Sequence, residues 1–227
     1  MPDAGRAKQR GDRGAEAAGR DTGAAGDGYF SIGRTTTRVA DLIAKARAVF
    51  AAEHALLCRP GLDADLLALL AGFGARARFR PQTVEGVGHR LVETPPHAGA
   101  AIQLGLNRQE LRDWLTAVAD CGPLSHIEGR VVQTRPGGLD RLDWHRDTHA
   151  NMRLGVTIHL ADRCYEGGAF ELRERGAPDL TFRHADPRAG DVVLFDIGDR
   201  FEHRVCPVAA GEPRLVFTGW FMAAQSA

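Results

Sequence analysis

The stretch Leu142-Asp143-Trp144-His145-Arg146-Asp147 organises the rest of this chain. His145 and Asp147 are two residues apart, so on or just after a β-strand their side chains leave the same face. His203, far downstream, supplies a second imidazole. Two histidines and one carboxylate occupy one face of an octahedral metal ion and leave the opposite positions open. This set is typical of non-haem Fe(II) that reacts with oxygen.

The same spacing recurs at His184 and Asp186, in a segment that predicts a turn leading into a strand. Because the chain holds 9 histidines among 227 residues, such triplets also arise by chance. We therefore expect the first pair, and not the second, to bind a metal.

Composition sets the broad class. A chain of 227 residues is long enough for one domain with a sizeable core. The net charge is zero and no long basic run is present, so a nucleic-acid partner has no electrostatic support. No apolar run approaches the roughly 18 residues of a membrane span. The four cysteines lack Cys-x-x-Cys spacing, and with no signal peptide recognised we expect a cytoplasmic protein without disulfides.

Two compositional regions are distinguished along the chain. Residues 1–28 are rich in Gly, Ala, Arg and Asp and are expected to form a disordered tail. Residues 29–227 are expected to form a single domain, with helical support from 38–121 and a β core over 126–222.

Patterning in the first part of that domain predicts mainly helices. Helical spacing of apolar residues predicts an amphipathic helix over 38–53. A second helix is expected from 63 to about 74, one or two strands over 78–93, and an irregular loop over 99–105. Asn107 and Glu110 are expected to form the capping box of a third helix that ends near Asp120.

Beyond residue 126 the apolar period becomes that of strands. Eight extended runs follow at 127–134, 142–147, 153–160, 169–173, 180–182, 191–195, 203–207 and 214–221. Eight short strands separated by Gly, Pro and Asp turns predict a sandwich or jelly roll. The expected fold is thus mainly β (α+β), with the helices packed outside one sheet. A turn at 209–213 is expected to place Arg214 on a strand beside that of His203.

From about 126 to 221 the chain resembles the Fe(II)/2-oxoglutarate-dependent oxygenases of the prolyl-4-hydroxylase-like superfamily. The matching motifs occur in the family's order. They are Pro136-Gly137-Gly138 ahead of His145-Arg146-Asp147, the strand Val156 to Leu160, the Gly-Gly strand Tyr165 to Leu172, the segment Pro187 to Phe195, His203 to Val208, Gly211, Arg214 and Gly219-Trp220-Phe221. The resemblance implies a double-stranded β-helix.

The resemblance also implies roles for individual residues. His145, Asp147 and His203 would hold Fe(II), which 2-oxoglutarate would chelate through its keto oxygen and C1 carboxylate. Arg214 would bind the C5 carboxylate, because a planar guanidinium suits a bidentate charged pair. Thr218, four residues on and on the same strand face, would add a hydroxyl donor. Many relatives carry a tyrosine where this chain has 132–135, and Gln133 or Thr157 is the expected substitute.

The reaction implied is the oxidative decarboxylation of 2-oxoglutarate by O2 to succinate and carbon dioxide, coupled to abstraction of hydrogen from a substrate C–H bond. Because Asp147 is retained, we expect hydroxylation or another such oxidation rather than halogenation. Trp220 stands where the DNA-repair branch usually shows a second arginine, so nucleobase demethylation is not expected.

The sequence leaves four functions open. We expect a small-molecule substrate such as an amino acid or a biosynthetic intermediate, covered by residues 86–105 or 137–143. The remaining three are a peptide or protein side-chain hydroxylase, a non-catalytic jelly-roll binding protein, and a cupin-type metalloenzyme without 2-oxoglutarate. A cupin-type enzyme leaves Arg214 unexplained. The oligomeric state is not predicted.

Overall fold

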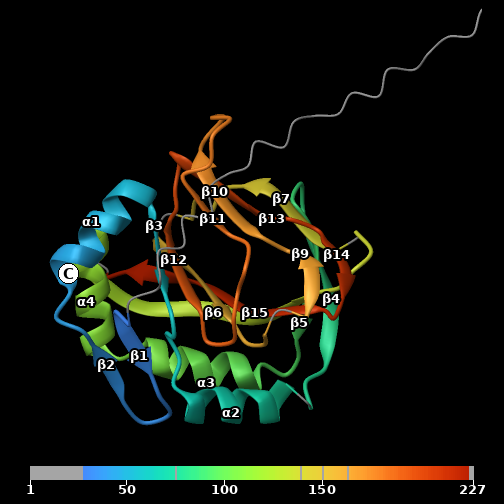
Figure 1. Cartoon of the computed structure of the whole chain (residues 1–227), viewed down its shortest axis with the longest axis horizontal. Coiled ribbons are helices and arrows are strands. Elements are labelled where there is room, and N and C mark those ends of the chain that lie inside the picture. The colour runs from blue at the N-terminus through green and yellow to red at the C-terminus, as the bar shows by residue number, and fades with distance from the viewer. Residues whose placement is uncertain (1–27, 75, 139, 150, 163, 225–227) are drawn as a thin grey trace, which may run out of the picture.

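A computed structural model describes residues 28–224 apart from 75, 139, 150 and 163. Its strands curl into a roll with an antiparallel sheet wound around an interior, and the helices lie outside it (Figure 1). The tail expected over 1–28 lies outside the described residues except for Gly28.

The strands lie along the whole described chain. Their bounds are β1 Phe30–Ile32, β2 Thr37–Val39, β3 Ala55–Cys58, β4 Phe79–Val84, β5 Gly88–Glu93, β6 Leu124–Thr134, β7 Arg141–His145, β8 Met152–His159, β9 Tyr165–Gly167, β10 Phe170–Glu174, β11 Phe182–His184, β12 Val192–Asp196, β13 Phe201–Val205, β14 Val208–Gly211 and β15 Arg214–Ala223. All eight runs expected beyond residue 126 are strands, with ends shifted by a few residues.

The main sheet has the order β11-β10-β13-β7-β5-β6-β15-β8-β12-β3, with β4 paired to β5. Every pairing between its strands is antiparallel. Separate two-stranded ladders join β1 to β2 and β9 to β14. The expected jelly roll of a mainly β fold is therefore confirmed.

Four helices cover one outer face of the roll: α1 Ile43–Glu53, α2 Ala64–Gly74, α3 His97–Leu106 and α4 Gln109–Ala119. Their apolar residues share one core with the outward side chains of β6, β8, β12 and β15. This core includes Phe50, Leu66, Ile102, Leu111, Trp114, Val131, Val156, Leu194, Phe217 and Phe221. The helices thus stabilise the sheet by removing apolar surface from water, and no helix in the described residues is long and apolar enough to cross a membrane.

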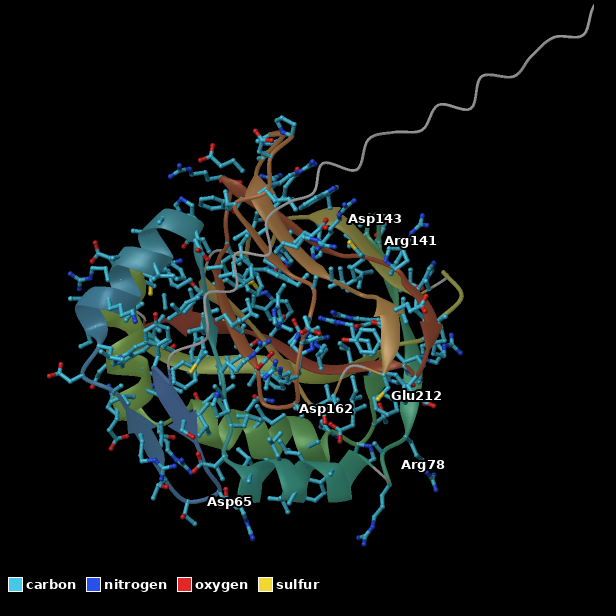
Figure 2. All side chains as sticks on the ribbon, in the orientation of Figure 1. Asp65, Arg78, Arg141, Asp143, Asp162 and Glu212 are labelled. Carbon is cyan, nitrogen blue, oxygen red and sulfur yellow. The ribbon has the colours of Figure 1, made fainter. Side chains whose placement is uncertain are left out.

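Strand alternation separates this core from the interior of the roll. On β15, Phe217 and Phe221 pack toward the helices, while Val216 packs with Val92 and Val132 on the other side. Arg214, Thr218 and Trp220 share the face of Val216 because side chains alternate along a strand. Charged side chains such as Asp65 and Arg78 lie on the outside (Figure 2).

The structure corrects several expectations in the helical part. The first helix begins at Ile43, because residues 37–39 pair with β1 instead, and β3 follows it directly. The segment 99–105 lies in α3, where the Glu93 carboxylate accepts hydrogen bonds from the N–H groups of Ala98 and Gly99 at 2.9 and 3.0 Å. A carboxylate at the positive end of a helix stabilises it.

The expected capping box is also wrong. Arg108 is the N-cap of α4, and the Asn107 side chain instead accepts a hydrogen bond from the backbone N–H of Ile127 at 2.9 Å. Strands β9 and β14 were not expected as a pair, and β14 occupies part of the predicted turn at 209–213. Strand β15 pairs with β6 and β8, whereas β13 pairs with β10 and β7, so Arg214 and His203 are not on neighbouring strands.

Candidate metal centre

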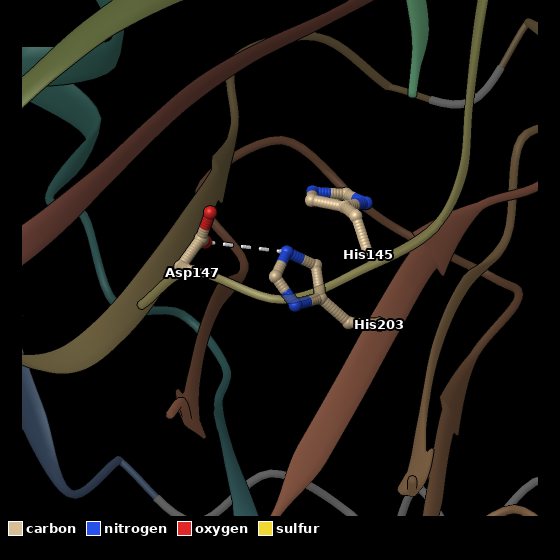
Figure 3. A group of neighbouring side chains, drawn as sticks. All are labelled: His145, Asp147 and His203. Atoms are coloured by element: carbon tan, nitrogen blue, oxygen red, sulfur yellow. Dashed lines mark ion pairs between the residues drawn. The ribbon is translucent and has the colours of Figure 1, made fainter. Parts of the chain in front are cut away.

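His145, Asp147 and His203 converge inside the roll (Figure 3). One potential ligand atom from each lies within 4.8 Å of the others, and the two imidazole ring centroids are 4.2 Å apart. His145 ends β7 and faces His203 of β13 directly across the ladder. Among the described residues, no other group of three or more His, Cys, Asp or Glu side chains is close enough to hold a metal ion.

A β-bulge turns His145 into the interior. Between two pairings, His203 with His145 and Val205 with Leu142, β7 contains one more residue than β13. Without that residue His145 would share the outer face of Arg141 and Asp143, which are exposed (Figure 2). A bulge shifts the alternation by one position and so redirects the following side chains. The site therefore depends on this irregularity as well as on the two-residue spacing.

Neighbouring groups hold the first histidine and the carboxylate in place. The Nδ1 atom of His145 lies 2.7 Å from the carbonyl oxygen of Asp143, which leaves Nε2 for a metal ion. Trp220 donates a hydrogen bond from Nε1 to the Oδ2 atom of Asp147 at 2.6 Å. The role of Trp220 was not predicted, although its place six residues after Arg214 on one strand puts both on the same face.

His203 is held in its neutral form. Burial, and after it the proximity of His145, lower the pKa of this imidazole to about 3 against the opposing attraction of Asp147. Its Nε2 atom lies 3.4 Å from the Oδ2 atom of Asp147, and the Phe195 ring lies 4.8 Å away from its own ring, centroid to centroid. A neutral imidazole is the form that binds a metal ion. Two such nitrogens with one carboxylate oxygen fit Fe(II) and leave positions for other ligands.

Arg214 lies deeper in the roll and is 2% exposed. Its Nε and Nη2 atoms are buried and make no hydrogen bond in the structure. Burial lowers the pKa of the guanidinium, an effect that Tyr165 opposes by charge and by a hydrogen bond. A buried cation without an anionic partner is costly. The arrangement therefore fits a bound carboxylate, such as the one at C5 of 2-oxoglutarate.

Tyr165 and the Gly-Gly turn shape the space around Arg214. Gly168 has φ +69°, and a Cβ atom there would lie 2.8 Å from the Tyr165 ring and 3.2 Å from Cδ of Arg214. Glycine is required because it tolerates the backbone conformation and leaves room for both side chains. A tyrosine thus does contact the arginine, but it comes from β9 rather than from 132–135.

Strand register decides which of the other residues predicted to bind the co-substrate face the interior of the roll. Thr218 pairs with Thr157 on β8, so both hydroxyls share the interior face with Arg214. Gln133 pairs with Leu215, and Leu215 packs against the helical core, so the structure does not bring the Gln133 side chain to the site. Thr134, which pairs with Arg214, occupies the interior position instead.

One further histidine, His159, lies near Arg214, and a second, His184, lies beside His159. His159 is 2% exposed, its Nε2 atom has no hydrogen-bond partner in the structure, and burial followed by the charge of Arg214 lowers its pKa well below the usual range. The ring of His184 lies 5.3 Å from that of His159, centroid to centroid. His184 faces Asp191, at 3.2 Å between Nε2 and Oδ2, and Arg59 binds the same carboxylate. Of the second His-x-Asp triplet, His184 thus lies in a buried cluster with Asp191 and Arg59, whereas Asp186 is exposed and accepts a hydrogen bond from Arg59 through its backbone carbonyl.

A cavity of about 560 Å³ borders two of the three candidate metal ligands, His145 and Asp147. It is lined by Val84, Arg90, Glu128, Arg130, Leu142, His145, Asp147, His149, Asn151, Met152, Trp220 and Met222. The cavity brings polar and apolar side chains of β4 to β8 and β15 to one place next to two of the three candidate ligands.

Solved structures with this fold were found for most of the chain. A prolyl-4-hydroxylase from Pseudomonas putida is 23% identical, with a TM-score of 0.61, over 81% of this chain and 100% of that one. A 2OG-Fe(II) oxygenase family oxidoreductase from Burkholderia pseudomallei is 20% identical, with a TM-score of 0.59, over 82% and 93%. The α-ketoglutarate-dependent epimerase SnoN from nogalamycin biosynthesis is 16% identical, with a TM-score of 0.59, over 80% and 81%.

Sequence comparison is more selective. No protein of curated function matches the chain. Residues 131–222 match the model of the 2OG-Fe(II) oxygenase superfamily, and this range contains the candidate metal ligands His145, Asp147 and His203 as well as Arg214. The match confirms the resemblance that the motifs indicated. Over this range the chain is similar to the 2OG-Fe(II) oxygenase superfamily, whose enzymes use Fe(II), 2-oxoglutarate and O2.

Proposed function

We propose that this protein is an Fe(II)- and 2-oxoglutarate-dependent dioxygenase that hydroxylates, or otherwise oxidises at a C–H bond, a small molecule. The observation that carries the proposal is the buried Arg214, whose Nε and Nη2 atoms have no hydrogen-bond partner among the described residues, inside the same roll as His145, Asp147 and His203. Three candidate metal ligands alone are compatible with many activities. Three such ligands together with a buried cation that can bind a carboxylate are suited to a 2-oxo dicarboxylic acid.

In the proposed site His145 and His203 would hold iron through an imidazole nitrogen each, and Asp147 through its carboxylate. When bound, the iron, 2-oxoglutarate and O2 supply an oxidant for a C–H bond and release succinate and carbon dioxide. The Asp143 carbonyl oxygen orients His145, and the indole N–H of Trp220 orients Asp147. Arg214 holds the far carboxylate of the co-substrate with Thr218 beside it on the same face, and the surrounding phenylalanines exclude water from His203.

A cavity of about 560 Å³ supports a small-molecule substrate, because typical small-molecule sites have volumes of about 300–1,000 Å³. Hydroxylation of a peptide or protein side chain is the second candidate, and the likeness to a prolyl-4-hydroxylase favours it. The likeness to an epimerase of antibiotic biosynthesis favours the small molecule.

A cupin-type enzyme or a binding protein would explain less of the site. A cupin-type enzyme without 2-oxoglutarate gives no partner to the buried Nε and Nη2 atoms of Arg214. A non-catalytic binding protein gives no reason for three metal-binding side chains with oriented donors. We further propose that residues 29–227 act as one unit, since helices and sheet share a core. We place the protein in the cytoplasm, where its four free cysteines stay reduced.

The test is an anaerobic titration of the metal-free protein with Fe(II) and then 2-oxoglutarate, followed by visible absorption. A weak charge-transfer band that needs both additions is expected, and His145→Ala should abolish it. Trp144→Phe is the matched control, because Trp144 precedes His145 but stacks on Arg173 and Arg204, at 3.9 and 4.6 Å, on the outer face. The absence of a band in folded, iron-loaded protein would overturn the proposal.

A further inference from the structure

The cavity beside His145 and Asp147 contains two arginines that the proposed reaction does not use. Arg90 comes from β5 and Arg130 from β6, and both line the cavity together with Asp147 and Trp220. Both residues lie outside the range 131–222 that matches the superfamily model.

Arg90 is buried, with 9% of its surface exposed. Its Nε atom donates a hydrogen bond to Oε1 of Gln82 at 2.8 Å, and within the described residues the two terminal amino groups make no hydrogen bond. Burial, and after it repulsion by Arg130, lower the pKa of Arg90 to about 10 against the opposing attraction of Asp147. The guanidinium is thus desolvated, lies close to a second cation, and has free donors at the cavity.

Arg130 has no carboxylate partner among the described residues either. Its guanidinium carbon lies 5.7 Å from the ring centroid of Trp220, a cation–π contact. Besides Asp147, Glu128 is the one acidic residue that lines the cavity, but its side chain is 61% exposed and pairs with His126 at 3.3 Å. Asp147 is taken by the proposed metal ion, so the positive charge of the two arginines is not neutralised.

We propose that the substrate is a small molecule carrying an oxyanion, a carboxylate or a phosphate, which Arg90 and Arg130 bind while its oxidisable C–H bond faces the metal. The inference rests on the proposed function and names the substrate class of that site. Planar guanidinium groups bind oxyanions through paired, charge-assisted hydrogen bonds.

The position of the arginines also orients the substrate. Arg90 interacts electrostatically with Asp147. Arg130 stacks on the indole of Trp220, whose N–H donates a hydrogen bond to the same carboxylate. The anionic group is therefore bound on the β5–β6 side of the cavity, near the proposed metal ion. A neutral molecule of the same shape leaves both guanidinium groups unpaired, which disfavours its binding.

The experiment measures how tightly small anions bind to the protein. The protein is loaded with Zn(II) and saturated with 2-oxoglutarate, so that no reaction can occur. The probes are matched pairs: benzoate and benzamide, hexanoate and hexanamide, with phenyl phosphate and inorganic phosphate as the phosphate arm. Calorimetry and thermal unfolding should detect binding of either the carboxylates or the phosphates, and no binding of the amides. Arg90→Gln and Arg130→Gln should each raise the Kd about 10- to 100-fold.

Arg80→Gln is the control, because it removes the same charge from an exposed position on neighbouring β4. Equal binding of anion and amide, unchanged Kd in both cavity variants, or no binding of any anion at millimolar concentration would overturn the inference. So would binding of an aspartate-containing peptide when every small anion fails. The Fe(II)/2-oxoglutarate band, measured on the same variants, separates this failure from failure of the proposed function and verifies that Arg90→Gln is folded.

Discussion

The two ends of the roll's interior both contain arginine side chains but differ in how enclosed these side chains are. At the deep end Arg214 is enclosed, with His159 and Tyr165 beside it, and two of its nitrogen atoms are cut off from both solvent and partners. At the mouth Arg90 and Arg130 border an open cavity. We infer that a closed site of fixed shape suits a co-substrate used in every turnover. The open site suits the variable substrate, so specificity is expected to lie at the mouth.

The largest expected effect at the mouth comes from Trp220→Phe, which keeps the ring beneath Arg130 and removes the N–H that binds Asp147. Loss of a hydrogen bond to a metal ligand typically weakens metal binding about 10- to 100-fold. The Kd for Fe(II) or Mn(II), measured by competition with a chelator, should rise accordingly, while Trp144→Phe should leave it unchanged. An unchanged Kd in Trp220→Phe would show that the indole only packs.

At the deep end Gly168→Ala should perturb the co-substrate site. The new Cβ atom would press on Tyr165 and Arg214, and the alanine backbone would have to keep a positive φ. Together these effects should lower the free energy of unfolding by about 1–3 kcal/mol. The Kd for 2-oxoglutarate should rise with it. Gly176→Ala is the control, because Gly176 also has a positive φ, +72°, but has nothing within 4 Å. If both variants weaken 2-oxoglutarate binding equally, contact with Arg214 is not the cause.

The smallest expected effect concerns acid stability at the same end. Burial and Arg214 hold the pKa of His159 well below its usual range, so below about pH 6.5 the unfolded state binds a proton that the folded state does not. The free energy of unfolding should therefore fall as the pH falls below that value.

His159→Gln should make this acid-induced fall shallower in denaturant titrations between pH 7 and 5. His126→Gln, at an exposed position, is the comparison. Identical slopes for the native protein and His159→Gln would contradict the assignment of a buried neutral imidazole.

Much of the core was predictable because apolar alternation and turn residues directly report strands. The same reasoning placed His145, Asp147 and His203 together. It could not foresee the bulge in β7, since one extra residue in a ladder depends on the partner strand. Nor could it find that Tyr165 reaches Arg214 from a short strand paired with β14.

The wrong predictions for other segments also have physical reasons. The glycines of 99–105 predict a loop, yet they serve close packing in a helix: a Cβ at Gly105 would lie 2.7 Å from Ile32. Gln133 was expected near the co-substrate because it lies at the right place in the sequence. The register with β15 gives that position to Thr134 and turns Gln133 away. A one-residue difference in register decides which face a side chain occupies.

The most direct test of the central claim compares two co-substrate analogues in protein loaded with Zn(II). Calorimetry should show 2-oxoglutarate binding at least about 100-fold more tightly than 2-oxobutyrate, which lacks the far carboxylate. In Arg214→Ala that ratio should shrink to within about tenfold, because the partner of the carboxylate is gone. A native protein that does not distinguish the two acids, or a ratio that survives in Arg214→Ala, would contradict the account.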